Sequence, residues 1–275
     1  MSILLDHFQI FIISLTCAEQ RRAWMQSHLH DRGLEQWRFV DGIVGAELTE
    51  AQIQQEHDAR RGMARAGRAF TSGEIGCALS HRKAYELMLS NQQNSALILE
   101  DDAYLAEDIK LVLAAAADWL LSDTPRLLLL SPMRAFLNKS GQALTARHRR
   151  VTMHRAWNAH GYALNRAAAQ LLIKENTPIY LMADDWVAYR RACHIEICGV
   201  EPFCIGTHEL ASDSYLEKER ASRRKHRRSW RFRFNNKLEK LQRQVLEIVW
   251  LKPRYGIKGQ RSGRPDEDTQ FDGVS

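Results

Sequence analysis

The feature that most constrains this chain is a short apolar run that ends in three consecutive acidic residues. Residues 96–103 read Ala-Leu-Ile-Leu-Glu-Asp-Asp-Ala, and the apolar part is too short for a helix, which is typical of a buried strand. The carboxylates of Glu100, Asp101 and Asp102 repel one another unless a cation compensates them. Oxygen ligands of this kind suit a hard divalent ion such as Mg²⁺ or Mn²⁺, which commonly accompanies phosphate. A solvated acidic turn is the alternative interpretation of this segment alone.

Composition places the chain among ordinary globular proteins. Its 275 residues are 45% hydrophobic and 26% charged, enough for one large or two modest domains with a core. No run of eighteen apolar residues occurs, so we expect no transmembrane helix, and the first residues do not resemble a signal peptide. Five cysteines without metal-type spacing indicate reduced core thiols of a cytosolic protein. A zinc site of Cys193, His194 and Cys198 is the alternative.

The charge is unevenly distributed along the chain. Residues 218–264 hold 17 Lys and Arg against 3 Asp and Glu, a net charge of +14, whereas the remaining residues have a net charge of −8. A mildly acidic body therefore carries a strongly basic segment near its C-terminus.

Strand-like and helix-like patterns alternate in the first 130 residues, which predicts a mostly parallel, three-layer α/β domain. The expected strands are residues 9–15, 37–40, 96–100, 127–130 and 159–164. The expected helices are residues 18–32, 49–61, 71–89, 108–121, 167–174 and 184–192. Thr49, with Gln52 three residues later, and Asn165 are expected to cap helices. The Gly- and Arg-rich residues 62–72 suggest a mobile loop over a site.

The basic segment also has an apolar periodicity. Between residues 238 and 251, leucine, valine and isoleucine recur at helical spacing, aromatic residues lie around them, and the segment 218–264 as a whole is rich in lysine and arginine. This pattern predicts an amphipathic helix that docks on an anionic membrane surface. A helix packed on the body and nucleic-acid binding are the alternatives. We accordingly divide the chain into a globular α/β body (1–217), a basic amphipathic membrane-associating segment (218–264) and a disordered acidic end (265–275).

Three segments together resemble glycosyltransferase family 25. The first joins Phe11-Ile-Ile-Ser-Leu15 to Glu19-Gln-Arg-Arg22 and Phe39-Val-Asp-Gly42, with Ser14 where the family usually has Asn. The second, residues 72–81, reads Ser-Gly-Glu-Ile-Gly-Cys-Ala-Leu-Ser-His and is the most specific. The third is the acidic strand end, and weaker similarity continues through residues 159–164, 178–185 and 212–214.

The resemblance implies a GT-A-like three-layer sandwich with a Rossmann-like nucleotide-sugar half. It also implies a divalent metal, Mn²⁺ or Mg²⁺, that bridges the phosphates of a UDP-sugar donor, and transfer of the sugar with inversion. Asp102 and Glu100 are the expected metal ligands, and His208 is expected to complete the metal shell unless its role is structural.

The resemblance assigns a further set of residues to the donor nucleotide. Arg21 follows the first strand, and His81 is expected at the sheet edge, although a hydrogen bond within the core would also explain it. The expected donor-binding residues are Ser14, Leu15, Arg21, Asp41, Gly42, Glu74, Gly76, Ser80, His81 and Asp101.

An inverting transfer needs a carboxylate that removes the proton of the acceptor hydroxyl. Asp184 and Asp185 are the candidates, with Asp184 favoured by the resemblance and Asp185 as the second choice. Because the pair begins an expected helix, one of the two is expected to cap that helix instead.

The function expected from these features is a hexosyltransferase that moves galactose from UDP-galactose to a lipid-linked glycan acceptor, as in lipopolysaccharide or surface polysaccharide synthesis. The protein would act peripherally on the inner face of the cytoplasmic membrane. A UDP-glucose-dependent glucosyltransferase, an inactive peripheral membrane-binding protein and a metal-dependent phosphodiesterase or nucleotidyltransferase are the alternatives.

Overall fold

The computed structural model describes residues 8–208, 245 and 247–265. Within these residues, nine strands form one mixed sheet in the order β11-β6-β7-β9-β5-β8-β3-β1-β2, and β4 pairs with β10 beside it. The strands are β1 (Phe8–Ser14), β2 (Trp37–Asp41), β3 (Ser95–Glu100), β4 (Ala103–Leu105), β5 (Arg126–Leu129), β6 (Ala135–Ala143), β7 (Arg149–Arg155), β8 (Gly161–Asn165), β9 (Glu196–Glu201), β10 (Ile205–Thr207) and β11 (Ile257–Lys258).

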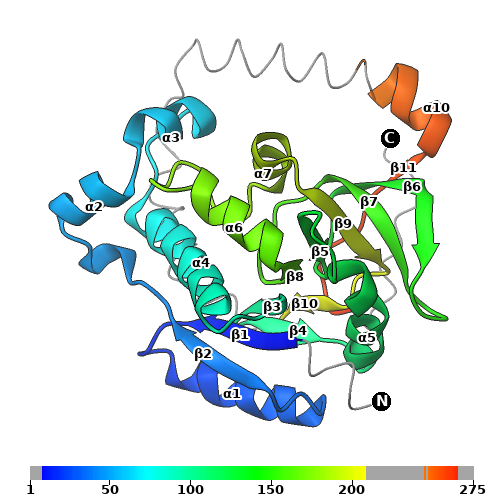
Figure 1. The fold of residues 1–275 in the computed structure, drawn as a ribbon, viewed down its shortest axis with the longest axis horizontal. Helices are drawn as coiled ribbons and strands as arrows, with labels where there is room; N and C mark the ends of the chain where they lie inside the picture. The colour runs from blue at the N-terminus through cyan, green and yellow to red at the C-terminus, as the bar shows by residue number, and fades with distance from the viewer. Residues whose placement is uncertain (1–7, 209–244, 246, 266–275) are drawn as a thin grey trace.

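Helices cover both faces of this sheet (Figure 1). They are α1 (Glu19–Asp31), α2 (Glu50–Glu56), α3 (Ala59–Ala66), α4 (Ser72–Ser90), α5 (Ile109–Leu120), α6 (Arg166–Glu175), α7 (Trp186–Cys193) and α10 (Lys252–Tyr255). Successive β3 residues point to opposite faces, so Ala96 and Ile98 pack with α4, α6 and α7, while Leu97 and Leu99 pack with α1 and α5. The predicted GT-A-like three-layer α/β sandwich is confirmed.

The prediction of a mostly parallel sheet is wrong. β1 is parallel to β2 and β3, and β5 is parallel to β9, but β8 runs antiparallel between β3 and β5. β6 and β7 add an antiparallel pair that the sequence analysis did not predict. The direction of a strand depends on long-range pairing, which local hydrophobic periodicity does not report. β6 was not predicted because its second half is exposed and polar and therefore lacks an apolar pattern.

The expected helix over residues 49–61 is divided in two, and the expected loop over 62–72 is shortened to residues 67–71. The predicted capping box of Thr49 and Gln52 starts α2. The chain then breaks at His57, because the backbone of Glu56 and Asp58 bonds to Ile179 on both sides of it. The Asp58 side chain caps α3, which continues through the first five residues of the expected loop, 62–66. A tertiary pairing therefore decided the break.

The described part of the basic segment returns to the body. β11 pairs antiparallel with β6 at the edge of the sheet opposite β2, and the Gln260 side chain bonds to the backbone of Met133 and Val200. Residues 238–244 of the expected amphipathic helix and the expected disorder of 266–275 lie outside the described residues. None of the helices in the described ranges is long and apolar enough to cross a membrane.

Candidate functional site

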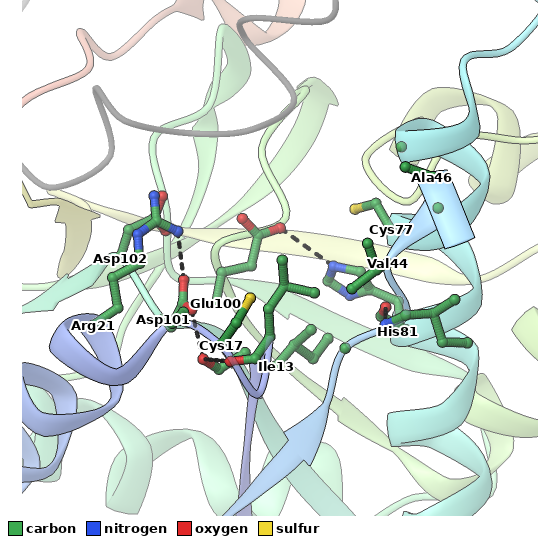
Figure 2. A pocket seen from close by; sticks show the side chains of 18 of the residues that line it. Ile13, Cys17, Arg21, Val44, Ala46, Cys77, His81, Glu100, Asp101 and Asp102 are labelled. Atoms are coloured by element: carbon green, nitrogen blue, oxygen red, sulfur yellow. Dashed lines mark hydrogen bonds and ion pairs between the residues drawn. The ribbon is translucent and has the colours of Figure 1, made fainter. Parts of the chain in front are cut away.

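A cavity of about 520 Å³ opens where β1 and β3 end (Figure 2). This volume is within the usual range for a small-ligand site. Four parts of the chain line it: the end of β1 with the start of α1, the loop after β2, the N-terminal half of α4, and the acidic end of β3. The lining residues include Ser14, Leu15, Cys17, Arg21, Gly42, Gly45, Cys77, Ser80, His81, Glu100, Asp101 and Asp102.

The parallel register explains why distant segments meet there. Ser14 lies opposite Asp41 in the β1–β2 pair, and Ile13 lies opposite Glu100 in the β1–β3 pair. Because parallel strands end at the same edge of a sheet, the chain after each strand is delivered to one crevice. The resulting opening belongs to the half of the sheet that the sequence analysis predicted to bind the donor.

Helix α4 packs unusually close to the loop after β2. A Cβ atom added to Gly45 would lie 1.9 Å from the Ser72 carbonyl oxygen, and one added to Gly76 would lie 2.6 Å from the Ile43 carbonyl oxygen. The Ser80 hydroxyl accepts a hydrogen bond from the Ile43 N–H at 2.8 Å and donates one to the Gly76 carbonyl at 2.7 Å. Gly76 and Ser80 therefore shape the cavity wall.

Asp101 is the acidic residue whose charge is compensated. Its carboxylate accepts hydrogen bonds from the Ser14 hydroxyl at 2.6 Å and from the Arg21 guanidinium at 2.7 Å. Arg22 also donates to the Ser14 carbonyl oxygen at 3.0 Å. These bonds tie the start of α1 to the strand end, so Asp101 is a positioning group for Arg21 and Ser14 rather than an open ligand.

Asp102 has the opposite environment. Its Oδ1 atom is buried and has no hydrogen-bond partner among the described residues. Burial, followed by the charges of Glu100 and Asp101, raises the pKa of the Asp102 carboxyl to about 7. A buried carboxylate oxygen that lacks a partner beside two further carboxylates fits a divalent oxygen-seeking cation. Asp102 and Glu100 are the residues that could hold such an ion.

Glu100 faces the other wall of the cavity. Its Oε1 atom lies 3.3 Å from His81 Nε2, and His81 Nδ1 lies 2.8 Å from the Tyr162 hydroxyl. Burial tends to raise the pKa of Glu100, but the hydrogen bond and the charge of His81, together with the charges of His160 and Arg21, outweigh it and lower the pKa. His81 thus lines the cavity and also forms a hydrogen bond in the core, while its contact with a donor stays a prediction.

The backbone of His208 lies beside Asp102, just after the end of β3. Its N–H donates to the Asp102 carbonyl oxygen at 2.8 Å, and its ring packs on the Trp24 ring with centroids 4.3 Å apart. The structure therefore brings His208 next to Asp102, while its ring contacts α1.

Three of the expected donor-binding residues are not among those that line the cavity. Asp41 forms an exposed ion pair with Arg22 at 2.6 Å. Glu74 is buried, completes the capping box of α4 with Thr71, and pairs with Arg68 at 2.5 Å. Gly76 acts through the close packing described above.

Asp184 and Asp185 are adjacent but differ in environment. Asp185 caps α7 by accepting from the Ala188 N–H, and it forms a bidentate ion pair with Arg65, both N···O distances being 2.7 Å. The expectation that one of the pair caps the helix is confirmed, and the capping residue is Asp185. Asp184 precedes the cap and is half-buried. Neither residue is among those that line the cavity.

Three polar residues around Glu100 were not predicted from the sequence. Cys77 lies four residues before His81 on α4, a spacing that could have been noticed. Tyr162 accepts or donates to both His81 and Tyr85. His160 lies opposite Glu100 where β8 begins, and its Nε2 atom is buried without a hydrogen-bond partner in the described part of the chain. Only the unpredicted β3–β8 pairing brings His160 and Tyr162 to the site.

The cysteines form no disulfide in the described residues, and Cys193, Cys198 and Cys204 are buried. Burial raises the pKa of the Cys193 thiol to about 11 and that of Cys198 to about 12, which makes both inert. Cys193, His194 and Cys198 do not gather into a cluster of metal ligands within the described ranges.

Comparison with known proteins gives matches that include the segments lining the cavity. The family model described as glycosyltransferase family 25 (LPS biosynthesis protein) matches residues 7–187. A Haemophilus influenzae protein named as a glycosyltransferase is 26% identical over 180 residues, which are 64% of this chain and 61% of that protein. Human procollagen galactosyltransferase 2 is 28% identical over 105 residues, which are 37% of this chain and 17% of that protein.

Not every relative bears the name of an active enzyme. Mouse inactive glycosyltransferase 25 family member 3 is 29% identical over 105 residues, which are 37% of this chain and 18% of that protein. The chain spans less than two thirds of the length of each of these three relatives. Solved structures align at TM-scores of 0.36 and 0.39 and at 10% and 12% identity, a similarity too remote to inform function.

Proposed function

The chain belongs to glycosyltransferase family 25, and from that premise we propose that it transfers a hexose from a UDP-sugar to a glycan with inversion, assisted by a divalent cation. The observation that carries the proposal is the environment of Asp102. Its buried, unpartnered Oδ1 atom and raised pKa mark a site with excess negative charge at the mouth of a ligand-sized cavity. A cation of the Mn²⁺ or Mg²⁺ type would relieve that charge.

In this proposal, Asp102 and Glu100 would hold the ion. His208, whose backbone N–H bonds to the Asp102 carbonyl oxygen, is the proposed third ligand. When bound, the cation neutralises the diphosphate and stabilises the charge on the departing UDP. The ion pair of Asp101 with Arg21 fixes a guanidinium on the cavity wall, where it would face an anionic donor. Leu15 and Gly42 also line the cavity, where they would contact the nucleoside.

Asp184 is the proposed general base. Asp185 is occupied by the helix cap and by Arg65, so its lone pairs are committed. Asp184 lies one residue before the cap of α7 and is half-buried. Its role would be to accept the proton of the acceptor hydroxyl as that hydroxyl attacks the anomeric carbon.

Galactose is the proposed donor sugar, and glucose is the competing choice. The relatives named procollagen galactosyltransferase support galactose, while those named inactive make the measurement of turnover essential. The family description as an LPS biosynthesis protein supports a lipid-linked glycan as the acceptor.

A membrane-bound acceptor would be reached through the basic segment, which we propose docks peripherally on the inner face of the cytoplasmic membrane. Val245, Ile248, Val249 and Trp250 are each more than half exposed, and lysine and arginine follow them. Glu247 fastens this surface to the body through His154 at 2.8 Å. An apolar patch with basic neighbours is suited to an anionic leaflet.

The test of the transfer reaction is product analysis with UDP-galactose and UDP-glucose, each with Mn²⁺ and with EDTA, in the presence of a lipid-linked glycan acceptor. The proposal predicts metal-dependent release of UDP and faster turnover with UDP-galactose. Release of UMP and sugar phosphate would instead identify a phosphodiesterase or nucleotidyltransferase. The absence of both products would favour the inactive alternative.

The membrane proposal needs a separate variant, because truncation before residue 218 would also remove β11 from the sheet. We expect replacement of Ile248, Val249 and Trp250 by serine to weaken sedimentation with anionic vesicles, since the exposed apolar surface is lost. The matched control replaces Leu111, which is also about half exposed (49%). Unchanged sedimentation of the triple variant would contradict the docking surface.

A further inference from the structure

A group of potential metal ligands lies on the side of Glu100 that faces away from Asp102. Cys77, His81 and Glu100 each offer one ligand atom, and these atoms all lie within 4.8 Å of one another. Figure 2 shows Glu100 between Asp102 on one side and His81 with Cys77 on the other. All three residues are among those that line the cavity.

The local structure explains the convergence. Cys77 and His81 are four residues apart on α4 and therefore lie on the same helix face. Glu100 ends β3, the strand over which this helix packs. The two ligands on the helix are fixed by the same close packing of α4 that shapes the cavity.

The outer contacts of His81 match those of a metal-bound imidazole. The His81 ring is 2% exposed, and its Nδ1 atom lies 2.8 Å from the Tyr162 hydroxyl, which in turn lies 2.5 Å from the Tyr85 hydroxyl. When Nδ1–H donates to Tyr162, Nε2 presents its lone pair to Glu100 at 3.3 Å. In metal sites, a hydrogen bond from the ring nitrogen that does not bind the metal orients the histidine and fixes its tautomer. The His81 Nε2 lone pair and the Glu100 carboxylate oxygen repel each other unless a proton or a metal ion lies between them.

The donor set differs in kind from Asp102. A thiolate, an imidazole and a carboxylate suit a borderline-soft divalent cation, with Zn²⁺ as the typical case, whereas carboxylates alone suit Mg²⁺ or Mn²⁺. Three protein ligands leave a fourth position, as in zinc sites that bind a water or a substrate oxygen.

We infer that Cys77, His81 and Glu100 form a second cation site, selective for Zn²⁺-like ions, whose open position faces the cavity. This site does not depend on the transfer reaction proposed above, although both share Glu100. An oxygen ligand such as water or a phosphoryl group of a bound nucleotide would fill the fourth position.

The test is the absorption spectrum of the full-length, metal-stripped protein titrated with Co²⁺, which substitutes for Zn²⁺ and reports sulfur ligation. A sulfur-to-cobalt charge-transfer band is expected in the wild type. It should persist in Cys17→Ser, because Cys17 lines the same cavity but is not in the cluster. It should disappear in Cys77→Ser.

A Zn²⁺ titration by calorimetry provides the second measurement. Tyr162→Phe keeps the ring in place but removes the hydroxyl that orients His81, so we expect Zn²⁺ to bind about 10–100-fold more weakly. This variant also keeps the inference testable if Cys77→Ser does not fold. Circular dichroism of each variant verifies the fold.

The outcomes separate this site from the proposed function. Absence of the band in the wild type, or a band that survives in Cys77→Ser, would overturn the inference and leave a proton as the link between His81 and Glu100. A shift in melting temperature with UDP and Mn²⁺ reports on the Asp102 site instead. A Cys77-dependent cobalt band without that shift would retain the second cation site and refute the proposed function.

Discussion

The chain contains two Asp-Asp pairs near its proposed chemistry, and their environments differ. In the first pair, Asp101 is held by Arg21 and Ser14, whereas Asp102 has a buried oxygen without a partner in the described residues. In the second pair, Asp185 is held by Arg65 and by the start of α7, and Asp184 lies just before it. In each pair, one carboxylate has a structural role in an ion pair with an arginine.

The difference between the pairs lies in what surrounds the remaining carboxylate. Asp102 is crowded by Glu100 and Asp101, which raise its pKa together with burial, so it is suited to a cation. Asp184 lies next to the Arg65–Asp185 ion pair, and its proposed task is to accept the proton of the acceptor hydroxyl. The same dipeptide thus supports two different roles.

The largest effect is expected at the crowded pair. Asp102→Ala removes the proposed principal ligand of the cation, so we expect metal-dependent transfer to fall by at least about 1000-fold, comparable to the loss of a main stabiliser of leaving-group charge. Steady-state UDP release with saturating donor measures it. Asp123→Ala, at an exposed position, is the control. Full activity of Asp102→Ala would exclude Asp102 as a ligand.

The next effect compares the members of the second pair. Asp184→Asn should lower kcat by about 100-fold or more without changing the KM for the donor, because a general base acts on the acceptor hydroxyl. Asp185→Asn should leave kcat within a few-fold. If Asp185→Asn alone abolishes turnover, the two roles are reversed.

A smaller effect is expected on folding. Asp185→Ala removes both the cap of α7 and the partner of Arg65, so the free energy of unfolding should fall by about 2 kcal/mol. Urea denaturation followed by circular dichroism measures this change. Asp123→Ala should change it by less than about 0.5 kcal/mol. An unchanged midpoint for Asp185→Ala would mean that its ion pair adds nothing to stability.

The smallest effect is a pH dependence of stability in the metal-free protein. The folded pKa of Asp102 is about 7, above its ordinary value of 3.8, so charging this carboxyl destabilises the fold as the pH rises through that interval. Asp102→Asn should therefore be more stable than the wild type at pH 8 by on the order of 1–2 kcal/mol, a value reduced from the full shift because the side chain is partly exposed.

That advantage should shrink as the pH falls below 7 and vanish near pH 4, where the carboxyl is protonated in both states. Thermal melts in EDTA across this range provide the measurement. A stabilisation that does not vary with pH would show that the Asp102 charge is not the cause.

Local sequence was sufficient for the elements that build the cavity. The strand over residues 96–100, the helix over 71–89 and the caps at Thr49 and Asn165 follow from hydrophobic periodicity and capping chemistry, and all are present. The acidic strand end was recognised because its charges interrupt an apolar run. These signals depend only on neighbouring residues.

The remaining features depend on contacts between distant segments. The break at His57 follows from pairing with Ile179, and the pairing of Arg65 with Asp185 joins residues 120 positions apart. The β3–β8 pair that brings Tyr162 to His81 requires a strand direction that no local pattern encodes. For the same reason, sequence could name the two Asp-Asp pairs but could not say which member of each is held by an arginine.

The central claim is that the unpartnered Asp102 oxygen binds the cation that carries the donor diphosphate. Crystals grown with UDP and Mn²⁺, measured for the anomalous signal of manganese, test it most directly. The account predicts a manganese peak within about 2.2 Å of the Asp102 carboxylate, a usual distance for such ions and oxygen ligands, with the diphosphate on its other side. UDP bound in the cavity with no manganese at Asp102 would contradict it.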